Sequence, residues 1–305
     1  MPILSIKHVT TYRYYRPVAF GKHRMMLRPR DDADQKVLQS QLEIAPKPQE
    51  FAWERDRLGN HVAVAHFADR SDELRFVSTI LVRHAPNGFH KADIKEYACA
   101  YPFNYSAEDW SRLRHFILAR QSQPELTSWS DQFFTDGAAN THARLVDMTR
   151  TIRRTFRHVA RHDKGTQDPV RTIALGSGCC RDLAVLMMAV LRSRGIAARF
   201  VSGYVHLGEE EHDDEQQING GNTHAWVQCY VPGPGWVDFD PSAGVVGNEN
   251  LIRVAVAEHP RDAIPLQGTW YGSVSDHIAM EVGVSVKQHR RTEPFSEPNL
   301  KQAAG

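Results

Sequence analysis

The stretch from residue 178 to residue 241 constrains the fold more than any other part of this sequence. It opens with the motif GCCRD at 178–182 and continues as an apolar run, which predicts a helix that begins at a cysteine and ends before Gly195. Three β-rich runs follow, at 198–205, 223–231 and 236–240. A Pro-Gly-Pro-Gly turn joins the last two. The segment therefore predicts one helix followed by strands, with reactive side chains on both.

The chain divides by composition into four expected units. Residues 1–85 alternate in polarity between proline and Gly-Asn turns, which predicts a small antiparallel β-sandwich. Residues 86–167 shift toward helix and form a connecting segment, with helices expected after Ser106 and near Asn140. Residues 168–287 form the expected core. Residues 288–305 are polar and are expected to be disordered.

Composition is that of a soluble globular protein. Of the 305 residues, 41% are hydrophobic and 24% are charged, and the net charge of +1 provides no bulk field that would favour nucleic acid or a membrane surface. The sequence contains no apolar stretch approaching the roughly 18 residues of a membrane span. Four cysteines and no recognisable secretory signal favour a reducing cytoplasm over a disulfide framework.

A cysteine, a histidine and two aspartates make up a candidate reactive site. A thiol reacts as the thiolate, and Cys180 stands at a predicted helix start, where free N–H groups favour negative charge. Strand alternation places His224 on one face of its strand, as a candidate base. Asp238 and Asp240 share a face of the next strand, and either could orient the imidazole. Their spacing does not choose between them.

Several short motifs, in this order, resemble the transglutaminase-like superfamily. In the second half of the chain these are GCCRD at 178–182, GIAAR at 195–199 with SGY at 202–204, HAW at 224–226, and GWVDFDP at 235–241. The N-terminal segment resembles the β-domain that precedes this core in bacterial transglutaminase-like proteins, through HVTTY at 8–12, LRPR at 27–30 and DRLGN at 56–60. The resemblance covers roughly residues 1–285.

The resemblance implies an α+β fold, in which an N-terminal antiparallel β-sandwich precedes a papain-like or transglutaminase-like core with its cysteine helix packed on an antiparallel sheet. It implies Cys180 as nucleophile, His224 as base and Asp240 as orienter. Asp240 is chosen because the family's aspartate directly precedes a proline. Asp182 matches the acidic residue of the first motif and is expected to support the site. Cys179 stands where a hydrophobic residue is usual, which leaves a redox role open.

The leading functional hypothesis is a cysteine-dependent hydrolase, a protease or amidase, that acts on a peptide or protein substrate through a thioester. Transfer of the acyl group to an amine, as in a protein-glutamine γ-glutamyltransferase, is the alternative. A non-catalytic binding module is the hypothesis from another class. We expect no nucleic acid or membrane partner. Substrate identity, oligomeric state and the role of the N-terminal domain stay open.

No cofactor and no metal is expected. A zinc site is the main rival for the same residues, which would be Cys179, Cys180, Cys229, His212 and His224. The usual C-x2-C and H-x3-H spacings are missing, and adjacent cysteines rarely both fit one tetrahedral site. The sequence therefore favours the thiol-nucleophile interpretation.

Overall fold

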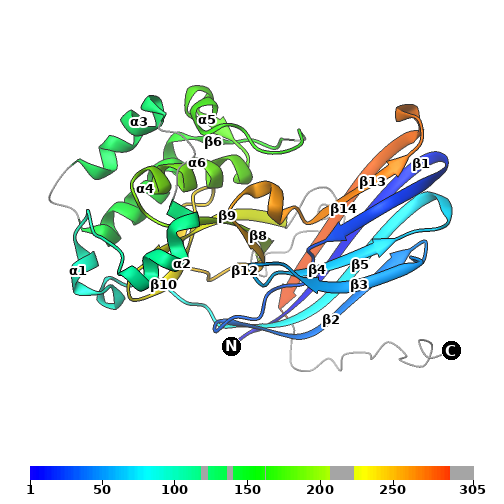
Figure 1. The fold of residues 1–305 in the computed structure, drawn as a ribbon, viewed down its shortest axis with the longest axis horizontal. Coiled ribbons are helices and arrows are strands. Elements are labelled where there is room, and N and C mark those ends of the chain that lie inside the picture. The colour runs from blue at the N-terminus through cyan, green and yellow to red at the C-terminus, as the bar shows by residue number, and fades with distance from the viewer. Residues whose placement is uncertain (118–122, 136–139, 162, 207–222, 289–305) are drawn as a thin grey trace.

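The computed structural model describes residues 1–117, 123–135, 140–161, 163–206 and 223–288, and it places a β-rich N-terminal part beside an α+β core (Figure 1). The N-terminal part is a seven-stranded antiparallel sheet. Its strands are β1 (Ile3–Met25), β2 (Gln35–Ala45), β3 (Glu50–Arg55), β4 (His61–His66), β5 (Arg70–His84), β13 (Leu266–Tyr271) and β14 (His277–Gln288). The order is β2-β5-β1-β4-β3, and β13 and β14 also pair with β1.

The N-terminal strands form a single curved sheet, whereas the alternation predicts two packed sheets. The cause is the length of β1, whose 23 residues pair along both halves with other strands of the sheet. Its first half pairs with β5 and β14, and its second half pairs with β13 and β4. Leu4 and Ile80 belong to an apolar cluster that continues into the core, while Phe20 and Phe76 belong to a separate one. The α+β class with an antiparallel N-terminal β-domain is confirmed.

Strands β13 and β14 come from the C-terminal end of the chain but complete the N-terminal sheet. Residues 266–288 pair with β1 in antiparallel register, with Tyr12 opposite Met280 and Phe20 opposite Trp270. The predicted core of 168–287 is therefore too long at its C-terminal end. Alternation marks a half-buried strand but does not say which sheet the strand joins.

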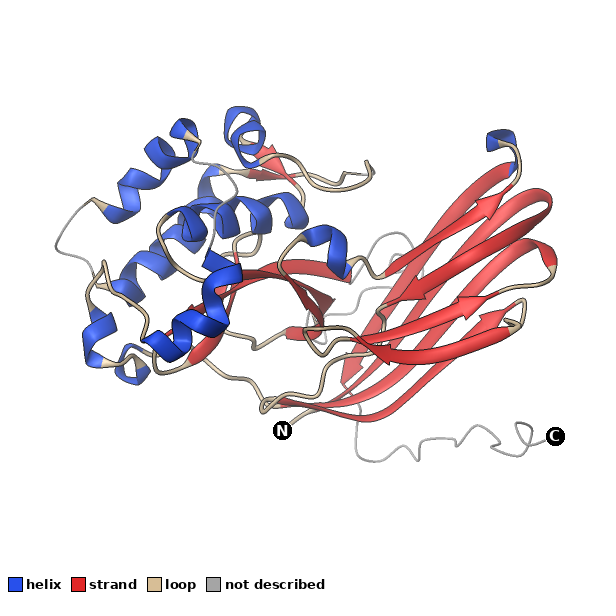
Figure 2. Cartoon of the chain, in the orientation of Figure 1, coloured by secondary structure: helices blue, strands red, loops and turns tan. Residues whose placement is uncertain are grey.

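The core consists of a five-stranded antiparallel sheet and a group of helices, of which the one over residues 180–193 packs on the middle strand (Figure 2). The sheet order is β11-β10-β9-β8-β12. Its strands are β8 (Ala198–Val205), β9 (Thr223–Val231), β10 (Gly235–Asp240), β11 (Val245–Val246) and β12 (Leu251–Ala257). The α-helices are α1 (Glu96–Cys99), α2 (Ala107–Ile117), α3 (Pro124–Phe134), α4 (Thr141–Thr155), α5 (Pro169–Leu175) and α6 (Cys180–Ser193).

Short elements connect these parts. The 3₁₀ turns are η1 (Lys91–Asp93), η3 (Pro260–Ala263) and η4 (Val274–Asp276). Strands β6 (Arg157–His158) and β7 (Ser177–Gly178) form a small parallel pair. Among the described residues, no helix has the length and apolar character needed to cross a membrane. The predicted disordered tail lies almost entirely outside the described residues.

Local signals in the sequence locate the core helices well. Ser106 accepts a hydrogen bond from the backbone N–H of Asp109 at the start of α2, at 3.1 Å. Asn140 caps α4 by accepting from the N–H of Ala143, at 2.9 Å. Helix α6 buries nearly all of its apolar side chains and packs on β9. The helix predicted to end before Gly195 ends at Ser193, and Gly195 has a positive φ of 75°.

The N-terminal part covers the edge of the core sheet with side-chain amides. The side chain of Asn60 donates to the carbonyl of Val256 at 2.8 Å and accepts from its N–H at 3.0 Å. Gln35 does the same with Arg253, at 2.7 and 3.0 Å. Strand β12 is an edge strand, and unpaired edge groups invite pairing with other chains. The two side-chain amides therefore satisfy backbone hydrogen-bonding groups of this edge strand and fix the position of the N-terminal part.

Candidate active site

The nucleophile candidate lies where β7 runs into α6. Cys179 is the N-cap residue, with extended backbone angles (φ −83°, ψ 174°), and Cys180 is the first residue of the helix. Gly178 passes so close to Asp182 that an added Cβ would lie 2.8 Å from the Cβ of that aspartate. A larger residue at 178 would therefore push the cysteines away from the helix start. The predicted cysteine-bearing helix is thus formed as the sequence indicates.

A fully buried carboxylate, Asp182, holds the loop before the helix. It accepts hydrogen bonds from the backbone N–H of Cys179 at 3.0 Å and of Gln167 at 2.7 Å, and from the Gln167 side chain at 3.0 Å. The guanidinium of Arg161 donates to it at 2.8 Å. Burial opposes its ionisation, but these hydrogen bonds and the ion pair hold the pKa of Asp182 well below its usual range.

The two adjacent thiols have different surroundings. Cys179 is buried, and its sulfur lies 3.1 Å from the carboxylate of Asp182. Cys180 is half-buried and packs against the core. The neighbouring Cys179 thiol and burial raise the pKa of the Cys180 thiol, and a hydrogen bond from the backbone N–H of Ala225, on the strand that bears the candidate base, opposes this shift. The structure therefore brings Cys180 to the strand that carries His224.

The titrations of Cys179 and Cys180 are coupled. A hydrogen bond from the Cys180 thiol lowers the pKa of Cys179 to about 5, although burial opposes this shift. The same hydrogen bond, with burial and repulsion between the sulfurs, raises the pKa of Cys180. Because Cys179 can donate its proton to the Asp182 carboxylate, that contact disfavours a charge on Cys179. The pair therefore carries one negative charge at a time, which the hydrogen bond between the thiols favours on Cys179 and the Asp182 carboxylate opposes there.

The base candidate is held by Asp240. The His224 side chain is 15% exposed, and its Nε2 lies 2.6 Å from a carboxylate oxygen of Asp240. The other Asp240 oxygen accepts from the N–H and hydroxyl of Ser242, at 2.9 and 2.7 Å, and from the N–H of Ala243 at 3.1 Å. Burial tends to raise the pKa of Asp240, but its bond to His224 and these donors lower it on balance. A fixed carboxylate therefore orients the imidazole.

The neighbouring aspartate, Asp238, has a different set of partners. One of its oxygens accepts from the indole N–H of Trp226 at 2.6 Å, and the other accepts from Arg253 at 2.7 Å. Asp238 is 4% exposed and belongs to a buried network. The structure thus distinguishes two residues that strand alternation leaves equivalent. Asp240, the residue chosen by its proline landmark, is the one that contacts His224.

The indole of Trp226 lies beside the candidate base. Its ring is stacked on that of His224 with centroids 6.1 Å apart and planes inclined by 26°. Trp226 is fully buried. An added Cβ at Gly203 would lie 2.6 Å from the indole and 2.1 Å from the carbonyl oxygen of Ile252, so only glycine leaves room there. The glycine of the SGY motif therefore makes space for the tryptophan of the HAW motif.

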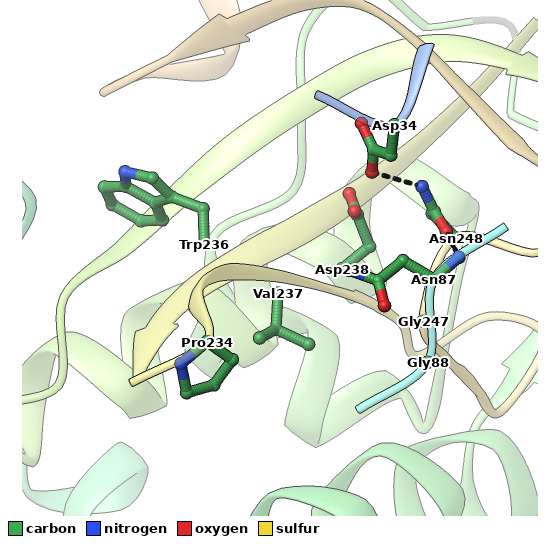
Figure 3. Close-up of a pocket in the computed structure, with 9 residues that line it drawn as sticks. All are labelled: Asp34, Asn87, Gly88, Pro234, Trp236, Val237, Asp238, Gly247 and Asn248. Carbon is green, nitrogen blue, oxygen red and sulfur yellow. Dashed lines mark hydrogen bonds between the residues drawn. The ribbon is translucent and has the colours of Figure 1, made fainter. Parts of the chain in front are cut away.

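The rival zinc set is not assembled among the described residues, in which no group of three or more histidine, cysteine, aspartate or glutamate side chains could hold a metal ion. His212 lies outside the described residues. Cys229 is completely buried, and burial raises the pKa of its thiol. A small polar cavity of about 30 Å³ lies by Asp238, between Asp34, Asn87 and Asn248 (Figure 3). It has room for one or two water molecules.

A cysteine at a helix start, on a sheet that carries a histidine and its carboxylate partner, defines a papain-like or transglutaminase-like protein class. The model of the transglutaminase-like superfamily matches residues 128–241, and the model of the bacterial transglutaminase-like N-terminal region matches residues 4–83. The chain belongs to the transglutaminase-like superfamily, with the N-terminal region found in its bacterial members.

The chain is also similar to curated relatives and to a solved structure. An uncharacterised protein of Mycobacterium tuberculosis is 26% identical over 297 residues, which cover 92% of this chain and 91% of the relative. A protein-glutamine gamma-glutamyltransferase of Pseudomonas aeruginosa is 36% identical over 66 residues, 22% of this chain and 10% of that protein. A structure from Cytophaga hutchinsonii, described as a candidate cysteine protease, has a TM-score of 0.71 at 18% identity and covers 98% of this chain and 95% of its own.

Several residues that build the site have no strong signal in the sequence. Gln167 and Arg161 reach Asp182 from a loop, and Arg253 reaches Asp238 from β12. Ser242 is an exception, because an aspartate followed two residues later by serine is typical of a turn in which the carboxylate accepts from backbone N–H groups. That signal favours Asp240 over Asp238 as the fixed carboxylate.

Proposed function

We propose that the protein is a cysteine-dependent hydrolase that cleaves peptide or carboxamide bonds through Cys180, His224 and Asp240. The observation that carries this proposal is the 2.6 Å contact between His224 Nε2 and Asp240. With Nε2 engaged by a carboxylate, the proton of the neutral imidazole resides there, and Nδ1 is left as the basic nitrogen. A base of this kind, beside a thiol at a helix start, suits nucleophilic catalysis.

The proposed reaction proceeds in two steps. Nδ1 of His224 takes the Cys180 proton, and the thiolate attacks the substrate carbonyl carbon. The backbone N–H groups at the start of α6 stabilise the negative oxygen that forms. His224 then returns the proton to the leaving amine as the carbon–nitrogen bond breaks. Water, deprotonated by His224, attacks the resulting thioester, releasing the carboxylic acid and restoring the thiol.

Cys180 is preferred over Cys179 because of the partners of the two sulfurs. Both the N–H and the sulfur of Cys179 face the Asp182 carboxylate, which repels a thiolate there. Cys179 thus completes the helix cap. Cys180 has the Ala225 N–H beside it, on the strand of the base.

Acyl transfer to an amine is the second candidate. It is favoured by the short match to the Pseudomonas aeruginosa protein-glutamine gamma-glutamyltransferase. Both reactions share the thioester and differ in what resolves it. A non-catalytic binding module requires none of the site's acid–base geometry, and so it is the less favoured alternative.

The test is turnover of a panel of peptide amides and γ-glutamyl amides, each with and without a primary amine, by the full chain and by Cys180→Ala and Cys179→Ala. Hydrolysis without amine that disappears in Cys180→Ala and persists in Cys179→Ala supports the proposal. Product that forms only with amine indicates the transferase. No turnover, together with a Cys180 thiol that alkylates no faster than a free cysteine, contradicts both.

We also propose that the protein works in a reducing compartment such as the cytoplasm. All four cysteines are free thiols in the structure, and a cysteine nucleophile beside a second thiol requires reducing conditions. Fractionation of the native cells, with the protein detected in the soluble cytoplasmic fraction, is the expected result. Recovery from an oxidising compartment would contradict it.

A further inference from the structure

The candidate base is connected to the N-terminal part of the chain by a line of buried polar contacts. The line starts at Trp226, whose ring lies on that of His224. The indole N–H of Trp226 donates to Asp238 at 2.6 Å, and Asp238 accepts from Arg253 at 2.7 Å. Trp226, Asp238 and Arg253 are all at least 96% buried. The position of the indole is therefore set by a residue on β12 as well as by its own strand.

The N-terminal part closes this line with two carboxylates. The guanidinium of Arg253 contacts Asp34, and it lies 3.3 Å from Asp32. Both aspartates belong to the connection between β1 and β2. Figure 3 shows the Asp34 and Asp238 carboxylates turned toward the same small cavity, where the side chain of Asn248 donates to Asp34. One arginine thus joins an aspartate of the core sheet to two aspartates outside it.

Such a network is a poor way to gain stability alone. Buried ions lose hydration, and replacing a buried ion pair with apolar side chains is often neutral or stabilising. What a satisfied polar network provides is a defined geometry, because each partner accepts few positions of the others. The apolar clusters already hold the N-terminal sheet against the core. A role in positioning side chains therefore explains the network better than a gain in stability does.

We propose that the N-terminal part positions the base through this line, so that Asp34, Arg253, Asp238 and Trp226 are positioning residues for His224. This rests on the proposed role of His224. When the line is intact, the indole limits the rotation of the imidazole toward the geometry shared by Asp240 and Cys180. When Asp34 loses its charge, Arg253 and Asp238 can shift, and the indole is released. The β-domain is then part of the catalytic apparatus.

The matched test compares Asp34→Asn with Asp131→Asn in the full chain. Asp131 also contacts an arginine, Arg194, but at the far end of α6, about 20 Å from its start by the rise of a helix. We expect kcat of Asp34→Asn to fall on the order of 10-fold to 100-fold with KM unchanged, which is the cost of a misplaced group. We expect Asp131→Asn to stay within about twofold, because distant sites act independently. Equal kcat losses in the two variants would overturn the proposal.

A readout that needs no turnover separates this proposal from the proposed function. The ring ¹⁵N signals of His224, assigned by their loss in His224→Gln, should shift in Asp34→Asn and stay in place in Asp131→Asn. Trp226→Phe keeps a ring but removes the N–H donor, and its effect should be non-additive with Asp34→Asn. Unchanged His224 signals in Asp34→Asn, or strict additivity, would overturn the positioning role. Shifted signals in a protein without turnover would leave it standing and remove the proposed function.

Discussion

The nucleophile side and the base side of the candidate site each depend on a buried aspartate, and the two are used in opposite ways. On the nucleophile side, Asp182 accepts hydrogen bonds from the backbone N–H groups of Cys179 and Gln167, and the half-buried Cys180 is not one of these partners. On the base side, Asp240 places one oxygen directly on His224. The Asp182 carboxylate fixes the backbone at the start of the helix, and the Asp240 carboxylate fixes the position of the proton on the His224 ring. The hydrogen-bonding partners of a buried aspartate therefore define its role more than the residue type does.

The largest expected effect separates Asp240 from its neighbour Asp238. Asp240→Asn should lower the rate on the order of 10³- to 10⁴-fold with little change in melting temperature, because an amide can hold the wrong imidazole tautomer. Asp238→Asn should lower the stability and should lower the rate by a smaller factor, on the order of 10-fold to 100-fold, since it weakens the support of buried Arg253 and Trp226. Steady-state kinetics and thermal melts of both variants check the contrast, and a reversed pattern would contradict it.

Removal of Asp182 should affect folding before chemistry. Asp182→Ala leaves Arg161 facing a buried space and frees the N–H groups of Cys179 and Gln167. Loss of one partner of a buried ion pair costs about 3–5 kcal/mol. Urea unfolding should show that loss, and any molecules that remain folded should retain a reactive thiol. A variant of wild-type stability would mean that Asp182 does not hold the helix start.

Acid should destabilise the protein through both carboxylates. The pKa values of Asp182 and Asp240 are lower in the folded protein than in the unfolded chain. Their contribution to stability is therefore present above the unfolded value of about 3.9 and is lost as the pH falls toward the folded values. The free energy of unfolding, measured by urea between pH 7 and pH 3, should therefore decrease as the pH is lowered. In Asp182→Asn the slope should be shallower, and an unchanged slope would exclude Asp182 as a source.

The smallest effect is expected at Cys179. Cys179→Ala should retain most of the activity, because its thiol faces Asp182 rather than the base. Adjacent thiols form only a strained and easily reduced disulfide. Peroxide should inactivate the wild type through Cys180, at a rate that Cys179→Ser leaves unchanged. A slower loss in Cys179→Ser, with a vicinal disulfide detected in the wild type by mass spectrometry, would establish the redox role instead.

The sequence predicts local elements of this fold better than their long-range pairing. Helix α6 and strands β8, β9 and β10 lie within one residue of the predicted bounds, since periodicity, turns and caps are local signals. The return of β13 and β14 to β1 could not be predicted, because alternation does not identify a partner strand. The same limit applies to the long, curved β1.

The candidate site follows the same division. The sequence supplies Cys180, His224 and Asp240 through motifs and alternation, and the structure places Asp240 on His224. The sequence does not predict the contacts of Arg253 with Asp34 and Asp238. Asp34 is more than 200 positions away from Arg253, and Asp238 lies on a separate strand. Polar networks of this kind depend on how distant segments fold together.

The pH dependence of Cys180 alkylation tests the central claim most directly. Iodoacetamide labelling of the full chain, followed by mass spectrometry of the peptide that carries both cysteines, gives the rate at each thiol as a function of pH. The account predicts selective labelling of Cys180 at neutral pH, at a rate above that of a free cysteine. It also predicts loss of that reactivity in His224→Ala. Labelling of Cys179 in preference, or a Cys180 that reacts as an ordinary thiol with and without His224, would contradict the account.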